Sequence, residues 1–364
     1  MSQGPVLIMA GGTGGHVFPA LAVARELRSR SERIVWLGTR SGIESRIVPA
    51  DGIALETIRV AGLRRKGALT WLLAPWRIAV ALIDAIRVVR RQRPKVVLGM
   101  GGFASGPGGV AAWLLGRPLV IHEQNAVAGL TNRVLARFAR EVLEAFPGSF
   151  FPEGKGRMTR VTGNPVRAEI NTLPPPAERL AGRSGALRLL VLGGSLGARV
   201  LNDVVPRAVA LLDAAERPEI LHQAGEKTVS VARGQYAASG VVARIEPFIE
   251  DMAAAYAWAD VAVCRAGALT VAELAAAGLP AILVPFPGAV DDHQTRNASV
   301  FVGAGAGVLL PESSLTAERL AAELAVFIAD RQVVVARAVA ARSLACPSAT
   351  ADIATLCQQL GAAA

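Results

Sequence analysis

The chain has 364 residues, 52% of them hydrophobic and 19% charged, and a formal net charge of +10. This length favours two domains, and the apolar content excludes a disordered chain. The positive charge predicts an acidic partner, such as a phosphorylated substrate or an anionic membrane surface. Nucleic acid is disfavoured as a partner, because no basic stretch is interleaved with aromatic side chains that could stack on bases.

Short apolar runs alternate with helix-patterned segments along the whole chain. The strands expected in the first half are Val6–Met9, Ile34–Leu37, Val96–Leu98, Leu119–His122 and Glu141–Leu143. The pattern breaks after Gly163-Asn164-Pro165, continues through a proline-rich linker and restarts at Leu187. The strands expected in the second half are Leu189–Leu192, Glu219–Gln223, Val241–Ile245, Val261–Cys264 and Ala281–Pro285. Such alternation predicts an α/β protein with two similar, doubly wound, parallel-sheet domains and a cleft between them.

Two glycine-rich turns lie at equivalent points of the two halves. Gly11–His16 follows the first strand of one half, and Gly193–Ala198 follows the first strand of the other. Each opens a helical run, so backbone N–H groups point outward and suit phosphate or another anion. The pair indicates a duplicated unit with a nucleotide-type ligand. A third such turn, Gly101–Pro107, follows the strand at Val96.

Polar residues that could carry chemistry follow several of these strands. His16 could take a proton from a hydroxyl, or only hydrogen-bond a neighbouring loop. His122-Glu123-Gln124-Asn125 lies at the carboxyl end of a strand, the edge that binds ligands in open α/β sheets. Glu273 could complement a helix dipole or accept hydrogen bonds from a ribose. The stretch Asp291–Asn297 suits sugar hydroxyls, although a surface loop would look similar.

One segment invites a membrane interpretation. Residues 69–89 are apolar but interrupted by Pro75, Arg77, Asp84 and Arg87, so they are not expected to span a bilayer. They form either an ordinary sheet-packing helix or, with Trp71, Trp76 and the nearby basic residues, an interfacial anchor on anionic lipid.

The three cysteines have neither metal-ligand nor disulfide spacing. Together with the lack of a signal peptide they favour a reducing cytoplasm.

Two other functions fit part of the pattern. Gly106–Ala111 formally matches the phosphate-binding fingerprint of an NAD-dependent oxidoreductase. However, Pro107 removes a backbone donor from that turn, and the turn at Gly193 stays unexplained. A non-catalytic module that binds a nucleotide sugar or a lipid is the second alternative.

Seven motifs together resemble, in order and spacing, the MurG family of peptidoglycan N-acetylglucosaminyltransferases. They are Gly11–His16, Gly101–Pro107, His122–Asn125, Gly163–Arg167, Gly193–Ala198, Ala268–Glu273 and Gln294–Asn297. The resemblance implies a GT-B fold of two Rossmann-like domains, residues 1–165 and 166–344, with a C-terminal helix at about 345–364 packing back on the first. It also implies inverting transfer of N-acetylglucosamine from UDP-N-acetylglucosamine to lipid I, giving lipid II, by a peripheral enzyme on the cytoplasmic face of the bacterial inner membrane.

The resemblance assigns roles to individual residues. His16 would be the catalytic base. The residues that would bind the donor are Thr13, Gly14, Gly15, Asn125, Arg167, Ser195, Ile249, Ala268, Leu269, Thr270, Val271, Ala272, Glu273 and Gln294. The acceptor diphosphate would be bound by Gly101, Gly102, Ser105 and Gly106. Neither a metal ion nor a cofactor is expected, and other cell-wall enzymes are possible partners.

Overall fold

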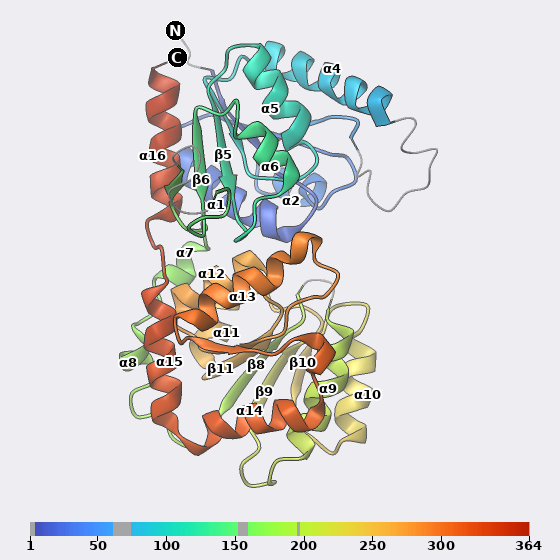
Figure 1. The fold of residues 1–364 in the computed structure, drawn as a ribbon, viewed down its shortest axis with the longest axis vertical. Helices are drawn as coiled ribbons and strands as arrows, with labels where there is room; N and C mark the ends of the chain where they lie inside the picture. The colour runs from blue at the N-terminus through green and yellow to red at the C-terminus, as the bar shows by residue number, and fades with distance from the viewer. Residues whose placement is uncertain (1–3, 61–73, 152–158, 195–196, 364) are drawn as a thin grey trace. The chain divides into compact units, whose positions relative to one another are not determined.

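A computed structural model describes residues 4–60, 74–151, 159–194 and 197–363 of the chain. The contacts within it divide the chain into two compact units (Figure 1). The first unit comprises Met1–Val166 and Cys346–Ala364, and the second comprises Arg167–Ala345. Serine 195 and the basic loop with Trp71, both of which entered the sequence predictions, lie outside the described residues.

The first unit contains a parallel sheet with the strand order β3-β2-β1-β4-β5-β6-β7. Its strands are β1 (Val6–Met9), β2 (Ile34–Gly38), β3 (Ala54–Thr57), β4 (Val96–Gly99), β5 (Leu119–Glu123), β6 (Glu141–Glu144) and β7 (Arg160–Val161). The order reverses between β1 and β4, which makes their carboxyl ends the edge where ligands bind in such folds.

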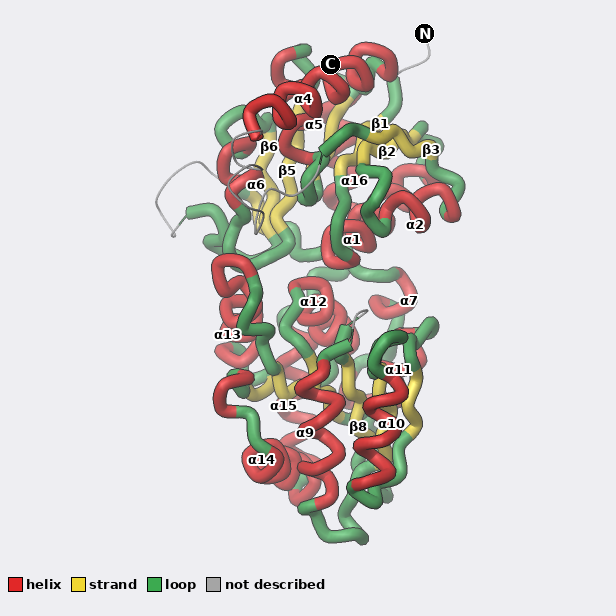
Figure 2. The backbone as a smooth tube through the Cα atoms, turned by 90° about the vertical axis from the view of Figure 1, so that its right-hand side faces the viewer, coloured by secondary structure: helices red, strands yellow, loops and turns green. Residues whose placement is uncertain are grey.

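Helices cover both faces of this sheet (Figure 2). They are α1 (Gly14–Ser29), α2 (Glu44–Ala50), α4 (Ala74–Gln92), α5 (Ser105–Leu114), α6 (Leu130–Leu135) and α16 (Ala349–Ala362). Successive residues of β1 face opposite cores: Ile8 packs with α1 and α16, and Leu7 packs with α4 and α5. Both faces of the strand are therefore buried, which explains its unbroken apolar sequence.

The C-terminal helix α16 is part of the first unit. Its residue Ile353 is fully buried in the core beside α1. A polar cluster fixes the same contact, in which Lys95 pairs with Glu32 at 2.7 Å and Gln358 of α16 donates to Glu32.

The second unit repeats the architecture with the strand order β10-β9-β8-β11-β12-β13. Its strands are β8 (Arg188–Leu192), β9 (Glu219–Gln223), β10 (Arg244–Glu246), β11 (Val261–Cys264), β12 (Ala281–Leu283) and β13 (Gly307–Leu309). Its helices are α7 (Ala168–Asn171), α8 (Pro176–Arg179), α9 (Arg199–Ala210), α10 (Val229–Ala238), α11 (Met252–Trp258), α12 (Ala268–Ala277), η1 (Val290–Asp292), α13 (His293–Gly303), η2 (Glu312–Ser314), α14 (Ala317–Ala329) and α15 (Arg331–Ser343). The prediction of two doubly wound parallel sheets is confirmed.

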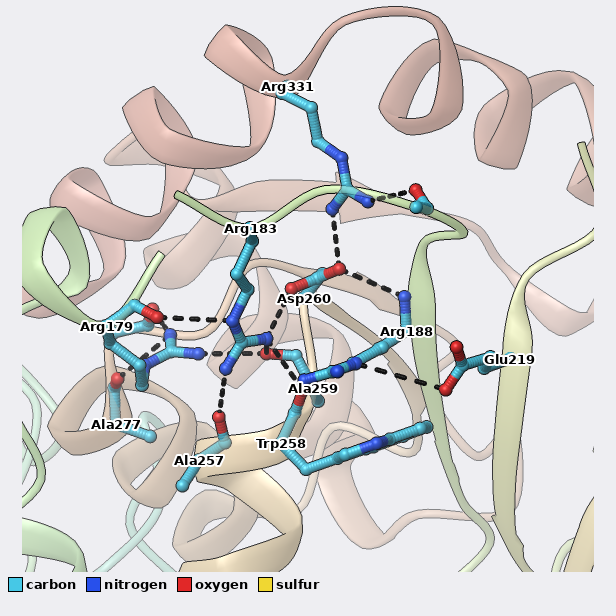
Figure 3. Close-up of polar contacts among 12 residues, drawn as sticks. Arg179, Arg183, Arg188, Glu219, Ala257, Trp258, Ala259, Asp260, Ala277 and Arg331 are labelled. Carbon is cyan, nitrogen blue, oxygen red and sulfur yellow. Dashed lines mark hydrogen bonds and ion pairs between the residues drawn. The ribbon is translucent and has the colours of Figure 1, made fainter. Parts of the chain in front are cut away.

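The expected proline-rich linker is instead anchored to the second unit (Figure 3). Arg183 and Arg331 both bind the carboxylate of Asp260, at 2.5 and 2.6 Å, and the carboxylate is almost completely buried. Arg179 of α8 donates to the carbonyls of Ala259 and Gly278. Arg179 and Arg183 thus hold the segment against the amino-terminal end of β11, opposite the carboxyl ends of the strands where the ligand is expected.

Candidate active site

The first glycine turn joins β1 to α1 and presents His16. Gly12 adopts a positive φ of 90°, and Thr13 precedes the helix in an extended conformation. The hydroxyl of Thr13 lies 3.2 Å from Nδ1 of His16, which is half-buried. In a ring whose Nδ1–H donates to Thr13, the lone pair is on Nε2, which is then the ring atom that can accept a proton.

The turn after β4 packs directly against the first turn. Gly101 and Gly102 have φ values of 92° and 87°. A Cβ on Gly101 would lie 2.5 Å from Cδ2 of His16, and one on Gly102 would lie 2.4 Å from the carbonyl oxygen of Gly11. Only glycine allows this approach, so the structure brings His16 and the predicted acceptor glycines together.

Ser105 stabilises the turn after β4 from the buried side. Its side chain is fully buried, and its hydroxyl donates to the carbonyls of Gly101 (2.7 Å) and Met9 (3.1 Å). The hydroxyl therefore holds the turn in shape, whereas the next residue, Gly106, is half-buried at the start of α5.

The polar motif at the end of β5 is mostly internal. His122 is fully buried, its Nε2–H donates to the carbonyl of Gly163 (2.9 Å), and its Nδ1 accepts from the amide of Gln124. Burial lowers the pKa of His122 to about 4, so the ring is neutral. Glu123 accepts hydrogen bonds from Asn125 and Asn132.

Within this motif Asn125 is the residue that stays half-buried. The buried residues of the motif mainly stabilise the end of the strand, and the partly exposed side chain of Asn125 is the one that a ligand can reach.

The glycine turn of the second unit is tied to the segment after β10 by Gln223, which sequence reasoning missed. The amide nitrogen of Gln223 donates to the carbonyl of Gly194 (3.2 Å), and its amide oxygen accepts from the backbone N–H of Ile249 (3.0 Å). A Cβ on Gly197 would lie 2.2 Å from the carbonyl oxygen of Ala224. The predicted donor residue Ile249 is therefore linked to the predicted donor turn through one buried side chain.

Glu273 lies at the centre of a buried network in the second unit. It is 4% exposed and occupies the second turn of α12, not the first. The hydroxyl of Tyr256 donates to its Oε2 (3.0 Å), and Nε of Arg167 lies 3.4 Å from its Oε1. Burial raises the pKa of Glu273, and Arg167 and Tyr256 oppose that rise. A simple helix-dipole role does not explain this arrangement.

The remaining predicted residues of α12 alternate in exposure. Ala268 and Val271 are buried, whereas Leu269, Thr270 and Ala272 are partly exposed. The side of α12 that carries Leu269, Thr270 and Ala272 is therefore accessible to a ligand.

Gln294 lies near the start of α13. Its side-chain oxygen accepts from the backbone N–H of Phe286 (2.9 Å). The preceding Asp291 and Asp292 have positive φ values of 53° and 49°, which is unusual for residues with a side chain. The strained turn and this hydrogen bond place Gln294 beside the end of the Phe286 loop.

The described residues bear on metal binding and on membrane insertion. No cluster of three or more histidine, cysteine, aspartate or glutamate side chains suited to a metal ion is found among them. None of their helices combines the length and apolar character that crossing a bilayer requires.

Comparison with known proteins gives the family. Residues 6–144 match the glycosyltransferase family 28 N-terminal domain, and residues 188–352 match the corresponding C-terminal domain. A relative from Alkalilimnicola ehrlichii is 60% identical over 97% of this chain and 98% of its own length, and one from Marinobacter nauticus is 57% identical over 96% of each. Both are named UDP-N-acetylglucosamine–N-acetylmuramyl-(pentapeptide) pyrophosphoryl-undecaprenol N-acetylglucosamine transferase.

Solved structures agree with this relationship. The crystal structure of Acinetobacter baumannii MurG aligns with a TM-score of 0.84 and 40% identity, covering 98% of this chain and 99% of that one. A glycosyltransferase of kitacinnamycin shares the fold alone, with a TM-score of 0.73 at 17% identity over 99% of this chain and 100% of that one. The chain therefore belongs to glycosyltransferase family 28 and, within it, to the MurG family of N-acetylglucosamine transferases.

Proposed function

We propose that this chain transfers N-acetylglucosamine from UDP-N-acetylglucosamine to the C4 hydroxyl of the N-acetylmuramyl sugar of lipid I, with inversion at the anomeric carbon, and so forms lipid II. The observation that carries the proposal is the nearly full-length match, at 60% and 57% identity, to relatives whose names state this transfer. The NAD-dependent alternative has no support in these relatives.

His16 is proposed as the general base. It would remove the proton from the acceptor hydroxyl, directly or through a water molecule, while the anomeric carbon passes through an oxocarbenium-like transition state. The contact of its ring with Gly101 supports this role, because it puts the base beside the turn assigned to the acceptor. The acceptor diphosphate is assigned to Gly101, Gly102 and Gly106, with Ser105 shaping their turn, and to the start of α1.

The second unit is proposed to hold the donor. Glu273 would accept the ribose hydroxyls, and the backbone at Ile249 would bind the uracil. The turn that contains Ser195 would stabilise the departing diphosphate through its N–H groups, with help from Arg167. Asn125, Gln294 and the Thr13–Gly15 turn would contact the transferred sugar. The exposed face of α12 is available to the same ligand.

The groups assigned to the departing diphosphate are backbone N–H groups and an arginine side chain. Because these groups can stabilise its negative charge, we expect turnover that needs no divalent cation. The check is a rate assay in excess EDTA. The rate should stay within twofold, and a loss of activity that Mg²⁺ restores would contradict the expectation.

An anionic membrane surface is proposed as a further partner, bound by the outer surface of α4, α5 and α6. Trp76 is 71% exposed on α4, Trp113 of α5 is half exposed, and its ring centroid lies 4.6 Å from that of Phe138 after α6. Exposed Arg133 and Arg137 accompany these rings. Tryptophan with arginine is the combination that binds at the interface of anionic bilayers. This surface would place the protein at the cytoplasmic face of the membrane, next to lipid I.

Vesicle sedimentation tests the membrane proposal. The double variant Trp76→Ser and Trp113→Ser should bind anionic vesicles at least fivefold more weakly and still use a soluble acceptor analogue. Val242→Ser, which removes a 93% exposed apolar side chain from the second unit, is the matched control. Unchanged vesicle binding by the double variant would remove this surface from the proposal.

The transfer itself is tested with labelled UDP-N-acetylglucosamine and a lipid I analogue. We expect a labelled disaccharide product, inverted at the anomeric carbon, and at least tenfold slower transfer from UDP-N-acetylgalactosamine. UDP binding without transfer would instead support the non-catalytic alternative.

A further inference from the structure

A buried carboxylate outside the proposed catalytic set is bonded to the first glycine turn. Glu44, the first residue of α2, is fully buried. Its Oε2 accepts from the backbone N–H of Gly12 at 3.0 Å. Its Oε1 accepts from the backbone N–H of Thr39 at 3.0 Å and from the hydroxyl of Thr39 at 2.7 Å. Three donors thus converge on one carboxylate at the carboxyl ends of β1 and β2.

The surrounding sequence is built to admit this side chain. A Cβ on Gly11 would lie 2.6 Å from Oε1 of Glu44, one on Gly38 would lie 2.7 Å from its Cγ, and one on Gly42 would lie 2.0 Å from its Oε2. Three glycines from three positions in the chain therefore leave the space that the carboxylate fills. Glu44 is a built feature of the turn, because a larger residue at any of the three would collide with it.

The place it occupies has a general chemical meaning. In doubly wound folds the turn after the first strand offers its N–H groups to a phosphate, and the end of the second strand lies beside the ribose. Here an N–H of that turn and an N–H at the end of β2 bind the chain's own carboxylate instead. In the second unit, the carbonyl of Gly194 in the matching turn accepts a hydrogen bond from a neutral amide, that of Gln223.

We propose that the Glu44 carboxylate is a built-in anion. It occupies the position in the first unit where other doubly wound folds bind a phosphate of their ligand. It is a positioning residue, since it fixes the turn that carries Thr13 and His16. It is also a specificity-determining residue, because it excludes nucleotide phosphates from Gly12 and Thr39 and leaves the start of α1 for the acceptor diphosphate. The last assignment rests on the proposed function.

Steady-state kinetics of Glu44→Gln and Glu44→Ala test the positioning role. Both variants should raise the acceptor KM at least tenfold and the donor KM less than threefold, because the Thr13–Gly15 turn would supply only part of the donor's contacts. The matched control is Asp51→Ala, because Asp51 follows the same helix, α2, and pairs with Arg25 of α1 at 2.6 Å. This control removes a carboxylate and weakens the packing of α2 without touching the turn, so both KM values should stay within twofold.

Rescue by a small carboxylate tests the built-in anion through the melting temperature, which does not depend on catalysis, as well as through KM. Formate should raise the melting temperature of Glu44→Ala by several degrees more than chloride at the same ionic strength, and it should lower the acceptor KM. Wild type and Asp51→Ala should not respond. If Glu44→Ala does not fold, the KM split of Glu44→Gln decides the question.

Equal changes of both KM values, or a Glu44→Ala protein that formate does not affect, would overturn the inference. If the chain transfers no sugar at all, the proposed function fails. The melting-temperature response of Glu44→Ala to formate would still show whether the position of the Glu44 carboxylate binds an anion.

Discussion

The two glycine turns follow the first strand of two units whose first six strands have the same order, yet their surroundings differ. The turn of the first unit is bonded to a carboxylate, Glu44, and carries a histidine at the start of its helix. The turn of the second unit is bonded to an amide, Gln223, which also holds Ile249. Both turns have a glycine with positive φ at their second position, Gly12 at 90° and Gly194 at 80°. We propose that the side chains that reach each turn from neighbouring elements determine which ligand the turn binds.

The largest expected effect concerns the histidine that only the first turn presents. His16→Ala should lower kcat by roughly 10²- to 10⁴-fold with little change in the donor KM, since it removes a general base and no donor contact of the second unit. The measurement is steady-state transfer to a soluble lipid I analogue. A kcat within threefold of wild type would remove His16 from the role and make the two turns chemically alike.

A pH dependence should appear in both units, because each buries a neutral histidine. Burial lowers the pKa of His122 to about 4 and that of His222 to about 3, from an ordinary value of 6.5. The unfolded chain therefore binds more protons than the folded one below pH 6.5. The free energy of unfolding should fall as the pH drops from 6.5 to 4, by about 3 kcal/mol for His122.

Urea unfolding at pH 7, 5.5 and 4.5 measures this loss. His122→Asn should flatten the dependence attributed to the first unit and leave that of the second. A wild-type stability that is constant over this range would contradict the neutral, buried state of both rings.

The carboxylate that we assign to the donor belongs to the second unit. Glu273→Gln should weaken UDP binding by about tenfold or more, since an amide replaces a charged acceptor and hydrogen bonds to charged groups contribute about 1.5–3 kcal/mol. Isothermal titration with UDP measures it, with Glu250→Gln as an exposed control from the same unit. An unchanged dissociation constant would remove Glu273 from the donor site.

The smallest effect is expected at the residue that holds this carboxylate. Tyr256→Phe deletes the hydroxyl bonded to Oε2 of Glu273 and should weaken UDP binding about three- to tenfold, consistent with the loss of one hydrogen bond. Binding of 2′,3′-dideoxy-UDP should change less, since that ligand lacks the hydroxyls assigned to Glu273. Equal losses for both ligands would assign Tyr256 to packing alone.

The strands that sequence reasoning found and missed differ in burial. β1 and β8 have four or more buried residues in succession, so composition alone reveals them. β3, β7 and β13 are edge strands, and none of their residues is fully buried. The strand expected from Val241 begins only at Arg244, after the 93% exposed Val242. A strand can be recognised in the sequence when both of its faces are buried, because its residues then form an unbroken apolar run.

The candidate site divides in a similar way. His16 and Glu273 could be proposed because each lies in a local motif that follows a strand. Glu44, Gln223 and Tyr256 could not, since their importance arises from contacts across 32, 29 and 17 positions of the chain. The spacing of residues within a short motif cannot indicate contacts between such distant positions. A glycine cluster around an acidic residue, as at Gly38, Gly42 and Glu44, is the signal that could have indicated the first of them.

Calorimetric titration of UDP most directly tests the central claim, that the first turn serves the acceptor diphosphate and the second turn the diphosphate of the donor. We predict one UDP site per wild-type chain, weakened tenfold or more by Glu273→Gln and altered less than twofold by His16→Ala. Two equivalent UDP sites per chain, or a loss of UDP affinity with His16→Ala as large as with Glu273→Gln, would contradict it.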